Sequence, residues 1–200
     1  MNKSIRYCFT LVVVALLLSG CQNNDSILPP VPVAIKEVQN EVIEKCLALN
    51  NTEPHEKLAY LYEQFNDVDK SGWYMVKDVA EDEGVFRGLS KWSGDGLKRI
   101  VLEDSTPSGD WFRIDDYCFN RDDNIARLYS DLRTFYGDVQ SIRTWEYYSD
   151  GSIKNSNTEL IDLKTEESIN PDEANYMDNP PQLVKNFEEL AKSLELTLEN

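Results

Sequence analysis

The residues that could carry out acid–base or nucleophilic chemistry are few and do not form a recognisable catalytic group. His55 is the only histidine, and it falls in the first turn of a segment with helical spacing. A single histidine excludes metal sites built from several histidines, and at this exposed position it leaves no plausible pairing with a serine or cysteine nucleophile. Asp115-Asp116 and Asp122-Asp123 are acid pairs, but adjacent strand residues point to opposite faces and aspartates are common in turns. We therefore expect no catalytic residue and no cofactor.

One segment has oxygen-bearing side chains at the spacing of a calcium loop and resembles the first half of an EF-hand. Positions one, three, five and twelve of such a loop would be Asp67, Asp69, Ser71 and Asp78. Met75, at position nine, offers no side-chain oxygen, and residues 73–79 have the pattern of a strand rather than of an exiting helix. The alternative is a helix end followed by a turn rich in Asp, Ser and Gly. We do not expect this segment to bind Ca²⁺.

Arginine and large aromatic residues alternate along three predicted strands, a composition typical of protein-binding surfaces. If they share one face of a sheet, the candidate binding residues are Trp111, Arg113, Arg127, Tyr129, Arg143, Trp145 and Tyr147. Arginine and aspartate that face each other on neighbouring strands can equally stabilise the sheet itself, by roughly 0.2–1 kcal/mol per pair. We favour this structural role, with a binding surface as the alternative.

The region that holds these residues has the two-residue period of β-strands. From Gly72 onward, apolar and β-branched residues alternate with polar ones between short turn sequences. These turns fall at residues 81–84, 93–96, 104–110, 120–124, 137–138 and 149–151. The spacing predicts an antiparallel meander of about seven strands between Trp73 and Leu163.

Apolar residues with helical spacing flank the strand region on both sides. The first such segment runs from Ile35 to Leu49 and the last covers residues 183–194. Between them, Thr52 can cap a helix whose apolar stripe would be Leu58, Leu61, Tyr62 and Phe65. We therefore expect an α+β fold, with an N-terminal helix hairpin and a C-terminal helix covering one face of the meander.

Two of the four cysteines, Cys46 and Cys118, lie in the part of the chain expected to fold. In an oxidising compartment such a pair is expected to form a disulfide, and closing a loop of this length would stabilise the fold by about 4 kcal/mol. Cys46 lies on the apolar stripe of the first helix, and Cys118 alternates with Phe112 and Ile114. The bond would therefore attach that helix to the sheet. The alternative is two separate buried thiols.

The N-terminus has the organisation of an export signal. Lys3 and Arg6 precede an apolar stretch, residues 7–18, that is shorter than the roughly 20 residues needed to span a bilayer. Leu18-Ser19-Gly20-Cys21 resembles the lipobox of bacterial lipoproteins. The resemblance implies cleavage before Cys21, which would then carry diacylglycerol and usually an acyl chain such as palmitate on its amine. The alternatives are an ordinary secretory signal and an uncleaved anchor helix.

The same resemblance places the protein in the cell envelope, attached to the membrane through its N-terminal lipid. Gln22, where lipoproteins kept in the inner membrane often have Asp, implies the outer membrane facing the periplasm, if the organism has two membranes. Residues 1–20 would be the signal peptide and residues 21–35 a lipidated, proline-rich tether. Residues 36–200 are then expected to form a single globular domain.

The chain is strongly acidic, with a formal net charge of −16. This charge argues against nucleic-acid binding and means that lipid, rather than surface charge, would hold the protein at the membrane. The predicted function is that of a non-enzymatic envelope lipoprotein that binds a protein or other envelope component through its sheet. One alternative is an acidic inhibitor or immunity-type protein for a basic enzyme or toxin. A less favoured alternative is a carboxylate-dependent hydrolase.

Overall fold

The computed structural model describes residues 33–49, 53–65, 68–79, 85–172 and 174–196. The lipobox, Cys21 and nearly all of the predicted tether lie outside these residues, so the lipid anchor stays a prediction. In the described part, no helix has the length and hydropathy needed to cross a membrane.

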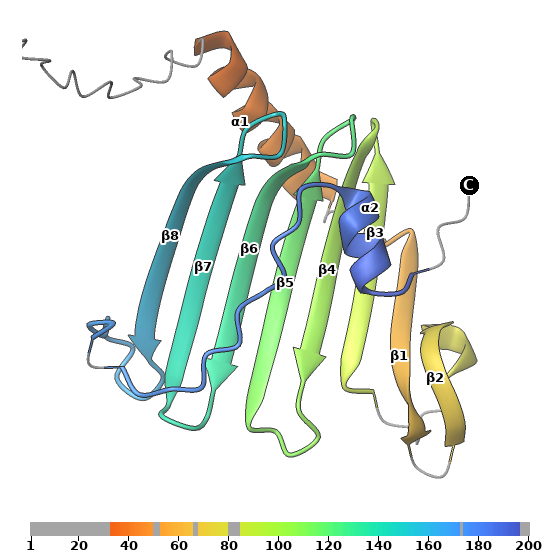
Figure 1. Cartoon of the computed structure of the whole chain (residues 1–200), viewed down its shortest axis with the longest axis vertical. Coiled ribbons are helices and arrows are strands. Elements are labelled where there is room, and N and C mark those ends of the chain that lie inside the picture. Colours follow the sequence, from red (N-terminus) through yellow and green to blue (C-terminus); the bar gives the residue numbers. More distant parts are fainter. Residues whose placement is uncertain (1–32, 50–52, 66–67, 80–84, 173, 197–200) are drawn as a thin grey trace, which may run out of the picture. The chain divides into compact units, whose positions relative to one another are not determined.

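Eight strands form one antiparallel sheet in the order β2-β1-β3-β4-β5-β6-β7-β8 (Figure 1). Helix α1 precedes the sheet and helix α2 follows it. The elements are α1 (Val33–Ala48), β1 (Glu56–Phe65), β2 (Val68–Met75), the 3-10 helix η2 (Val76–Asp78), β3 (Arg87–Gly94), β4 (Leu97–Ser105), β5 (Trp111–Phe119), β6 (Ile125–Thr134), β7 (Val139–Tyr147), β8 (Ile153–Asp162) and α2 (Phe187–Ser193). The predicted antiparallel meander is confirmed, but the described part of the chain contains eight strands and is mostly β.

The turns between β3 and β8 fall where turn chemistry predicted them. Asp95 and Gly96 connect β3 to β4 with φ angles of 54° and 77°. Gly137 and Asp138, between β6 and β7, have φ angles of 91° and 53°. Two consecutive residues with positive φ match the right-handed twist of the strands that they join, and Gly and Asp tolerate this conformation well.

The predicted second helix is wrong, because Glu56–Phe65 forms strand β1. This strand pairs with β2 on one side and β3 on the other. Ala59 and Leu61 are buried on one face of the sheet, whereas Leu58 packs against the core on the opposite face. A strand with apolar residues on both faces can reproduce helical spacing by chance, and this explains the error.

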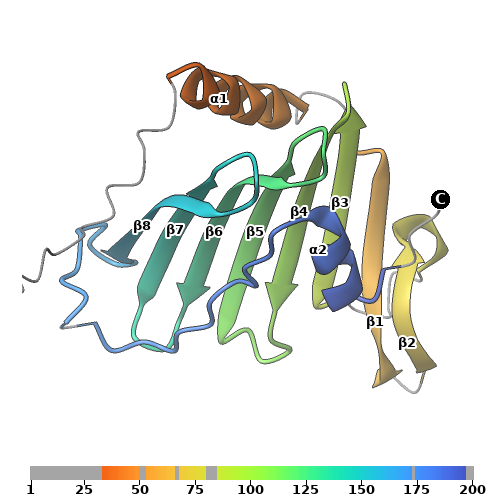
Figure 2. The same ribbon diagram turned by 45° about the horizontal axis from the view of Figure 1, so that its top comes forward.

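The two helices cover opposite faces of the sheet, whereas one shared face was predicted. Cys118 of β5 forms a disulfide with Cys46 of α1, with a Cα–Cα distance of 6.1 Å. The neighbouring residue Tyr117 points to the other side, as adjacent strand residues must. We call the side of Cys118 the α1 face and the side of Tyr117 the α2 face. In the view of Figure 1, α2 lies in front of the sheet and α1 behind it, and Figure 2 shows the two helices apart.

The main hydrophobic core lies between the α2 face and α2. It contains Leu89, Ile100, Leu102, Tyr117, Phe119, Ile125, Leu128, Tyr147, Val184, Phe187, Leu190, Ala191 and Leu194. The side chain of Asn186 caps α2 by accepting a hydrogen bond from the backbone N–H of Glu189. Trp73 of β2 donates its indole N–H to the carbonyl of Leu194 at 2.6 Å, which ties the end of α2 to the edge of the sheet.

Candidate functional site

The residues predicted to share one binding face are divided between the two faces. Tyr117 of β5 pairs with Leu128 of β6, so residues with odd numbers on β5 share a face with residues with even numbers on β6. The α1 face therefore carries Arg127 and Tyr129. The α2 face carries the other five: Trp111, Arg113, Arg143, Trp145 and Tyr147. The prediction of a single face was wrong for Arg127 and Tyr129.

The α2-face group is in contact with the protein's own C-terminal segment. We call residues 174–184 the C-terminal strap, which runs across the sheet toward α2 (Figure 1). Arg113 donates hydrogen bonds to the carbonyls of Asn179, at 3.1 Å, and Pro180, at 3.3 Å. Tyr117 donates its hydroxyl hydrogen to the carbonyl of Gln182 at 3.1 Å. The strap thus occupies much of the surface that the sequence offered to a partner.

Arg143 holds the first part of the same strap. Its guanidinium donates to the Tyr176 hydroxyl at 3.1 Å and to an Asp178 carboxylate oxygen at 2.8 Å. Burial alone would lower the pKa of Arg143, but these bonds and the charge of Asp178 outweigh it and raise the pKa. Arg143 therefore stays charged and keeps its contacts with the strap.

A buried ionic group lies beneath the strap on the α2 face. Arg113 is 2.9 Å from a carboxylate oxygen of Asp115 and 3.6 Å from one of Asp104. The hydroxyl of Ser130 donates to Asp115 at 2.7 Å. Burial raises the pKa of Asp115, while Arg113 and Ser130 act in the lowering direction. These partners compensate buried charges, which is the structural role that we favoured for the Arg–Asp pairs.

Arg127 and Tyr129 belong to a second ionic group, close to the end of α1. Arg99 makes two hydrogen bonds of 2.9 Å to Asp116 and donates to the carbonyl of Leu47 at 3.2 Å. Arg127 is 4.0 Å from the same Asp116 carboxylate, and its guanidinium lies 5.3 Å from the ring of Tyr129. A cation at the last carbonyls of a helix is favourable, so this group fastens α1 to the sheet.

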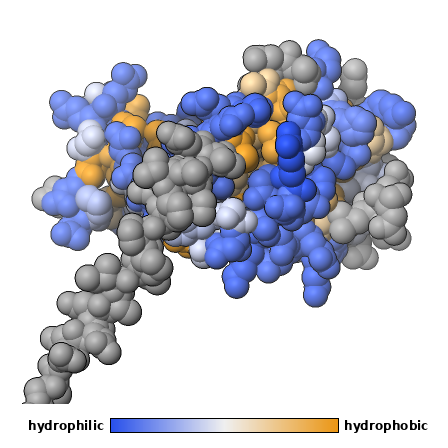
Figure 3. All heavy atoms as spheres, turned by 90° about the horizontal axis from the view of Figure 1, so that it is seen from above, coloured by the Kyte–Doolittle hydropathy of each residue, from blue (hydrophilic) through white to orange (hydrophobic). Residues whose placement is uncertain are grey.

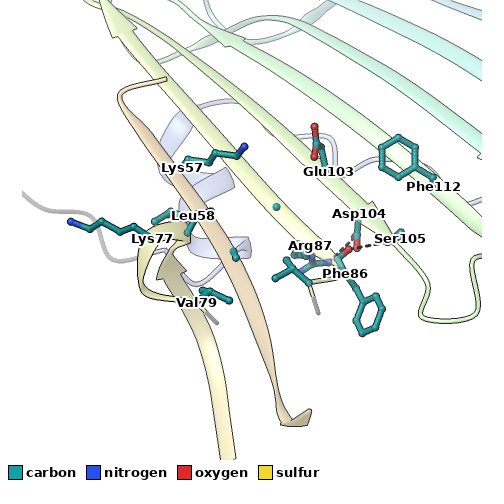
Figure 4. Close-up of a pocket in the computed structure, with 14 residues that line it drawn as sticks. Lys57, Leu58, Lys77, Val79, Phe86, Arg87, Glu103, Asp104, Ser105 and Phe112 are labelled. Carbon is teal, nitrogen blue, oxygen red and sulfur yellow. Dashed lines mark hydrogen bonds and ion pairs between the residues drawn. The ribbon is translucent and has the colours of Figure 1, made fainter. Parts of the chain in front are cut away.

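A cleft of about 640 Å³ opens on the α1 face, over strands β1, β3, β4 and β5 (Figure 4). We call it the β1–β4 cleft. Its lining consists of Lys57, Leu58, Ala59, Val76, Lys77, Val79, Val85, Phe86, Arg87, Gly88, Glu103, Asp104, Ser105 and Phe112. Ala59 of β1 pairs directly with Gly88 of β3, and Gly88 pairs with Glu103 of β4. Because Ala59 and Gly88 have almost no side chain, the surface of the sheet is recessed where they pair. These two residues form the floor of the cleft.

The walls of the β1–β4 cleft come from both sides of this floor. Val76 belongs to η2 and Val79 follows it, and both line the cleft. Phe112 comes from β5, on the other side of the cleft from Val79 (Figure 4). Arg87 donates to Asp104 at 3.0 Å. Burial alone would lower the pKa of Arg87, but the hydrogen bond and charge of Asp104 raise it. The cleft is therefore mostly apolar, with exposed charged groups at Lys57, Lys77 and Glu103. Arg87 and Asp104 border it, but their ion pair lies on the α2 side of the strands, beside Arg113.

A second hollow, of about 1,220 Å³, lies beside α2 and contains His55 in its lining. Four of its charged side chains form two ion pairs. Lys91 is 3.1 Å from Glu56, and Lys98 is 2.5 Å from Asp123. His55 itself is exposed. This hollow brings together no nucleophile and base, and the acids Asp115 and Asp116 point to opposite faces, each beside an arginine.

The calcium-loop candidate lies in a hairpin rather than between two helices. Asp69 and Ser71 are part of β2, Asp78 ends η2, and Asp67 falls outside the described residues. The Ser71 hydroxyl is 3.1 Å from the hydroxyl of Tyr60 on the neighbouring strand. In the parts of the chain that the structure describes, no three His, Cys, Asp or Glu residues gather closely enough to hold a metal ion.

Comparison of the chain with known protein families, with curated proteins and with solved structures finds no match. The β1–β4 cleft is therefore identified as a candidate site by its geometry alone. Sequence reasoning missed the β1–β4 cleft. One signal was present, because an isolated glycine such as Gly88 inside a strand marks a place where another group approaches closely. Its neighbour Ala59 was assigned to a helix, so the small pair could not be recognised.

Proposed function

We propose that this protein is a lipid-anchored lipoprotein of the bacterial cell envelope that binds an envelope component through the α1 face of its sheet. The N-terminal lipobox pattern supports the anchor. The observation that carries the binding role is the β1–β4 cleft, because ligand sites are concave, mostly apolar and about 300–1,000 Å³ in volume. In this proposal the protein holds its ligand and does not convert it chemically.

The α1 face is the better candidate because the α2 face is occupied by α2 and the C-terminal strap. Breaking the strap contacts would leave Arg113, Tyr117 and Arg143 without their carbonyl, hydroxyl and carboxylate partners. Unpaired buried polar groups are costly, so a partner would have to replace all of these bonds. A ligand in the β1–β4 cleft, by contrast, would not have to break any of these bonds.

Site-specific photo-crosslinking in intact cells tests this proposal. A photoreactive amino acid replaces Phe112, which lines the cleft, and in a control it replaces Leu183, an exposed residue of the strap with 49% of its surface accessible. We expect position 112 to give a specific crosslinked product with an envelope component and position 183 to give none. Equal products from both positions, or a product from position 183 alone, would contradict the assignment to the α1 face.

The anchor is tested separately by labelling cells with radioactive palmitate. The proposal expects label on the wild-type protein and none on Cys21→Ser. Cys8→Ser is the matched control, because Cys8 lies in the part removed with the signal and its loss should leave labelling unchanged. Labelling of Cys21→Ser would show that the lipobox was wrongly identified.

A further inference from the structure

We infer that the β1–β4 cleft binds a free fatty acid, with the hydrocarbon chain along the apolar walls and the carboxylate beside Lys57 and Lys77. This inference rests on the proposed function, because it names the chemical class of the ligand for the same cleft. Two independent properties of the lining support it, one concerning its apolar surface and the other its charge.

The apolar surface is exposed to an extent that calls for a cover. Val76 and Val85, which line the cleft, keep 40% and 42% of their surface accessible to solvent. Phe112 and Val79 are only half-buried. Covering such side chains with a hydrocarbon chain removes apolar area from water on both molecules, which favours binding. The cleft volume is that of a drug-sized ligand, so a single chain fits it better than a two-chain lipid.

The charge of the lining differs from that of the rest of the protein. The whole chain carries a net charge of −16, but the lining contains three basic residues and two acidic ones. Arg87 and Asp104 neutralise each other at 3.0 Å. The remaining charged groups are Lys57, Lys77 and Glu103, so positive charge exceeds negative charge among the described residues of the lining.

Lys57 and Lys77 also differ from most other cations of the molecule. Within the described residues, carboxylate partners within 4 Å are present for Lys45, Arg87, Lys91, Lys98, Arg99, Arg113, Arg127, Arg133, Arg143, Lys154 and Lys164. Lys57 and Lys77 have no such partner in the same residues. In so acidic a chain, two exposed lysines among the lining residues of an apolar cleft fit a ligand with an anionic head, which either side chain can reach by rotation.

The test uses the full lipidated protein in nanodiscs and a dodecanoic acid that carries a photoreactive group at the end of its chain. The corresponding alcohol and trimethylammonium compounds serve as neutral and cationic comparisons. After irradiation, mass spectrometry locates the labelled residues. We expect the acid to label residues of the β1–β4 cleft, and the alcohol and the ammonium compound to label them at least about tenfold less. Lengthening the acid should raise its affinity by up to about fourfold per methylene until the cleft is full.

Two variants test whether labelling depends on Lys57 and Lys77 and on the space above Gly88. Lys57→Glu combined with Lys77→Glu should weaken labelling by the acid about tenfold, while Lys185→Glu combined with Lys192→Glu, at exposed lysines near α2, should not change it. Gly88→Leu should abolish it, because a Cβ at position 88 meets only the Glu103 side chain, at 3.8 Å, and the longer side chain then fills the cleft. The lysine variants are at exposed positions, so they report on binding even if Gly88→Leu folds poorly.

The outcomes separate this inference from the proposed function. Labelling of the cleft that is equal for acid and alcohol and unaffected by the lysine changes would overturn the fatty acid but keep the cleft as the binding site. No labelling of cleft residues by any of the three compounds would also overturn the inference, and crosslinking from position 112 would then decide whether the proposed function stands. Labelling by the ammonium compound in preference to the acid would reverse the assigned charge of the ligand.

Discussion

The two faces of the sheet carry the same types of residue, but these residues have different roles on each face. On the α2 face, Arg113, Asp115 and Tyr117 lie beneath a strap of the protein's own chain and stabilise the fold. On the α1 face, α1 covers one end, where Arg99 and Asp116 fasten it, and the β1–β4 cleft remains open near the other end. Arginine and aromatic residues alone therefore do not identify a binding surface. What distinguishes the faces is which of them the rest of the chain covers.

One side of the molecule shows how hydrophilic and hydrophobic residues are distributed on its surface. Seen from the side shown in Figure 3, hydrophilic residues dominate and hydrophobic residues show in smaller areas between them.

The largest effect on the free energy of unfolding is expected for one of two phenylalanines of the same strand. Phe119 is fully buried on the α2 face and its ring lies 5.6 Å from that of Phe187, whereas Phe112 is only half-buried on the α1 face. We expect Phe119→Ala to lower the free energy of unfolding by about 3–5 kcal/mol. Phe112→Ala should cost clearly less, because part of its surface is already in water. Equal losses in urea denaturation would mean that the α1 face is as tightly packed as the α2 face.

The next effect concerns the attachment of α1. Cys46 and Cys118 are 72 positions apart in the sequence, so their bond restricts the unfolded chain strongly. Replacing both cysteines by serine should lower the free energy of unfolding by about 2–4 kcal/mol. The same denaturation experiment measures it, with reduced wild-type protein as the control for the substitutions themselves. A variant as stable as the oxidised protein would show that the bond does not hold α1 in place.

The strand region and its turns could be predicted because they depend on local chemistry. Alternation placed the strands, and Asp-Gly and Gly-Asp pairs placed the turns. The disulfide was predicted by counting cysteines. Strand β1 could not be recognised, because its apolar residues face both sides of the sheet and imitate a helix.

The face of each strand and the β1–β4 cleft required information that is not local. Whether odd or even residues of β6 share a face with Tyr117 depends on the length of the connection and on the bulge at Cys118 and Phe119. The cleft exists because β1 pairs with β3, which brings Ala59 beside Gly88. Neither fact follows from the pattern of a single strand.

A smaller effect should distinguish the buried acid of the α2 face by its pH dependence. Burial raises the pKa of Asp115 above its ordinary value of 3.8. The folded state then binds the Asp115 proton more tightly than the unfolded state does. Protonation of Asp115 therefore contributes fully to the free energy of unfolding below pH 3.8, and this contribution is lost as the pH rises through the folded-state pKa. Relative to Asp115→Asn, which does not titrate, wild-type protein should therefore lose stability as the pH rises from about 4. If wild-type protein instead became more stable relative to Asp115→Asn as the pH rises, the raised pKa would be contradicted.

The smallest expected effect compares two glycines. At Gly88 a Cβ would lie 3.8 Å from the nearest Glu103 atom, so Gly88→Ala should stabilise the strand by about 0.5–1 kcal/mol. At Gly151, φ is +79° and a Cβ would lie 2.7 Å from the carbonyl oxygen of Lys185. Gly151→Ala should therefore be destabilising in a thermal melt. A loss of stability at Gly88 would mean that the cleft floor has no room for a side chain.

The most direct test of the cleft as the binding site is native mass spectrometry of the lipoprotein released from its own envelope. The account predicts that the wild-type protein carries a bound molecule as an additional mass. It also predicts that Gly88→Leu, confirmed as folded by circular dichroism, lacks this mass, while Gly88→Ala retains part of it. The same additional mass on wild type and on Gly88→Leu would contradict the account, because the ligand would then bind outside the β1–β4 cleft.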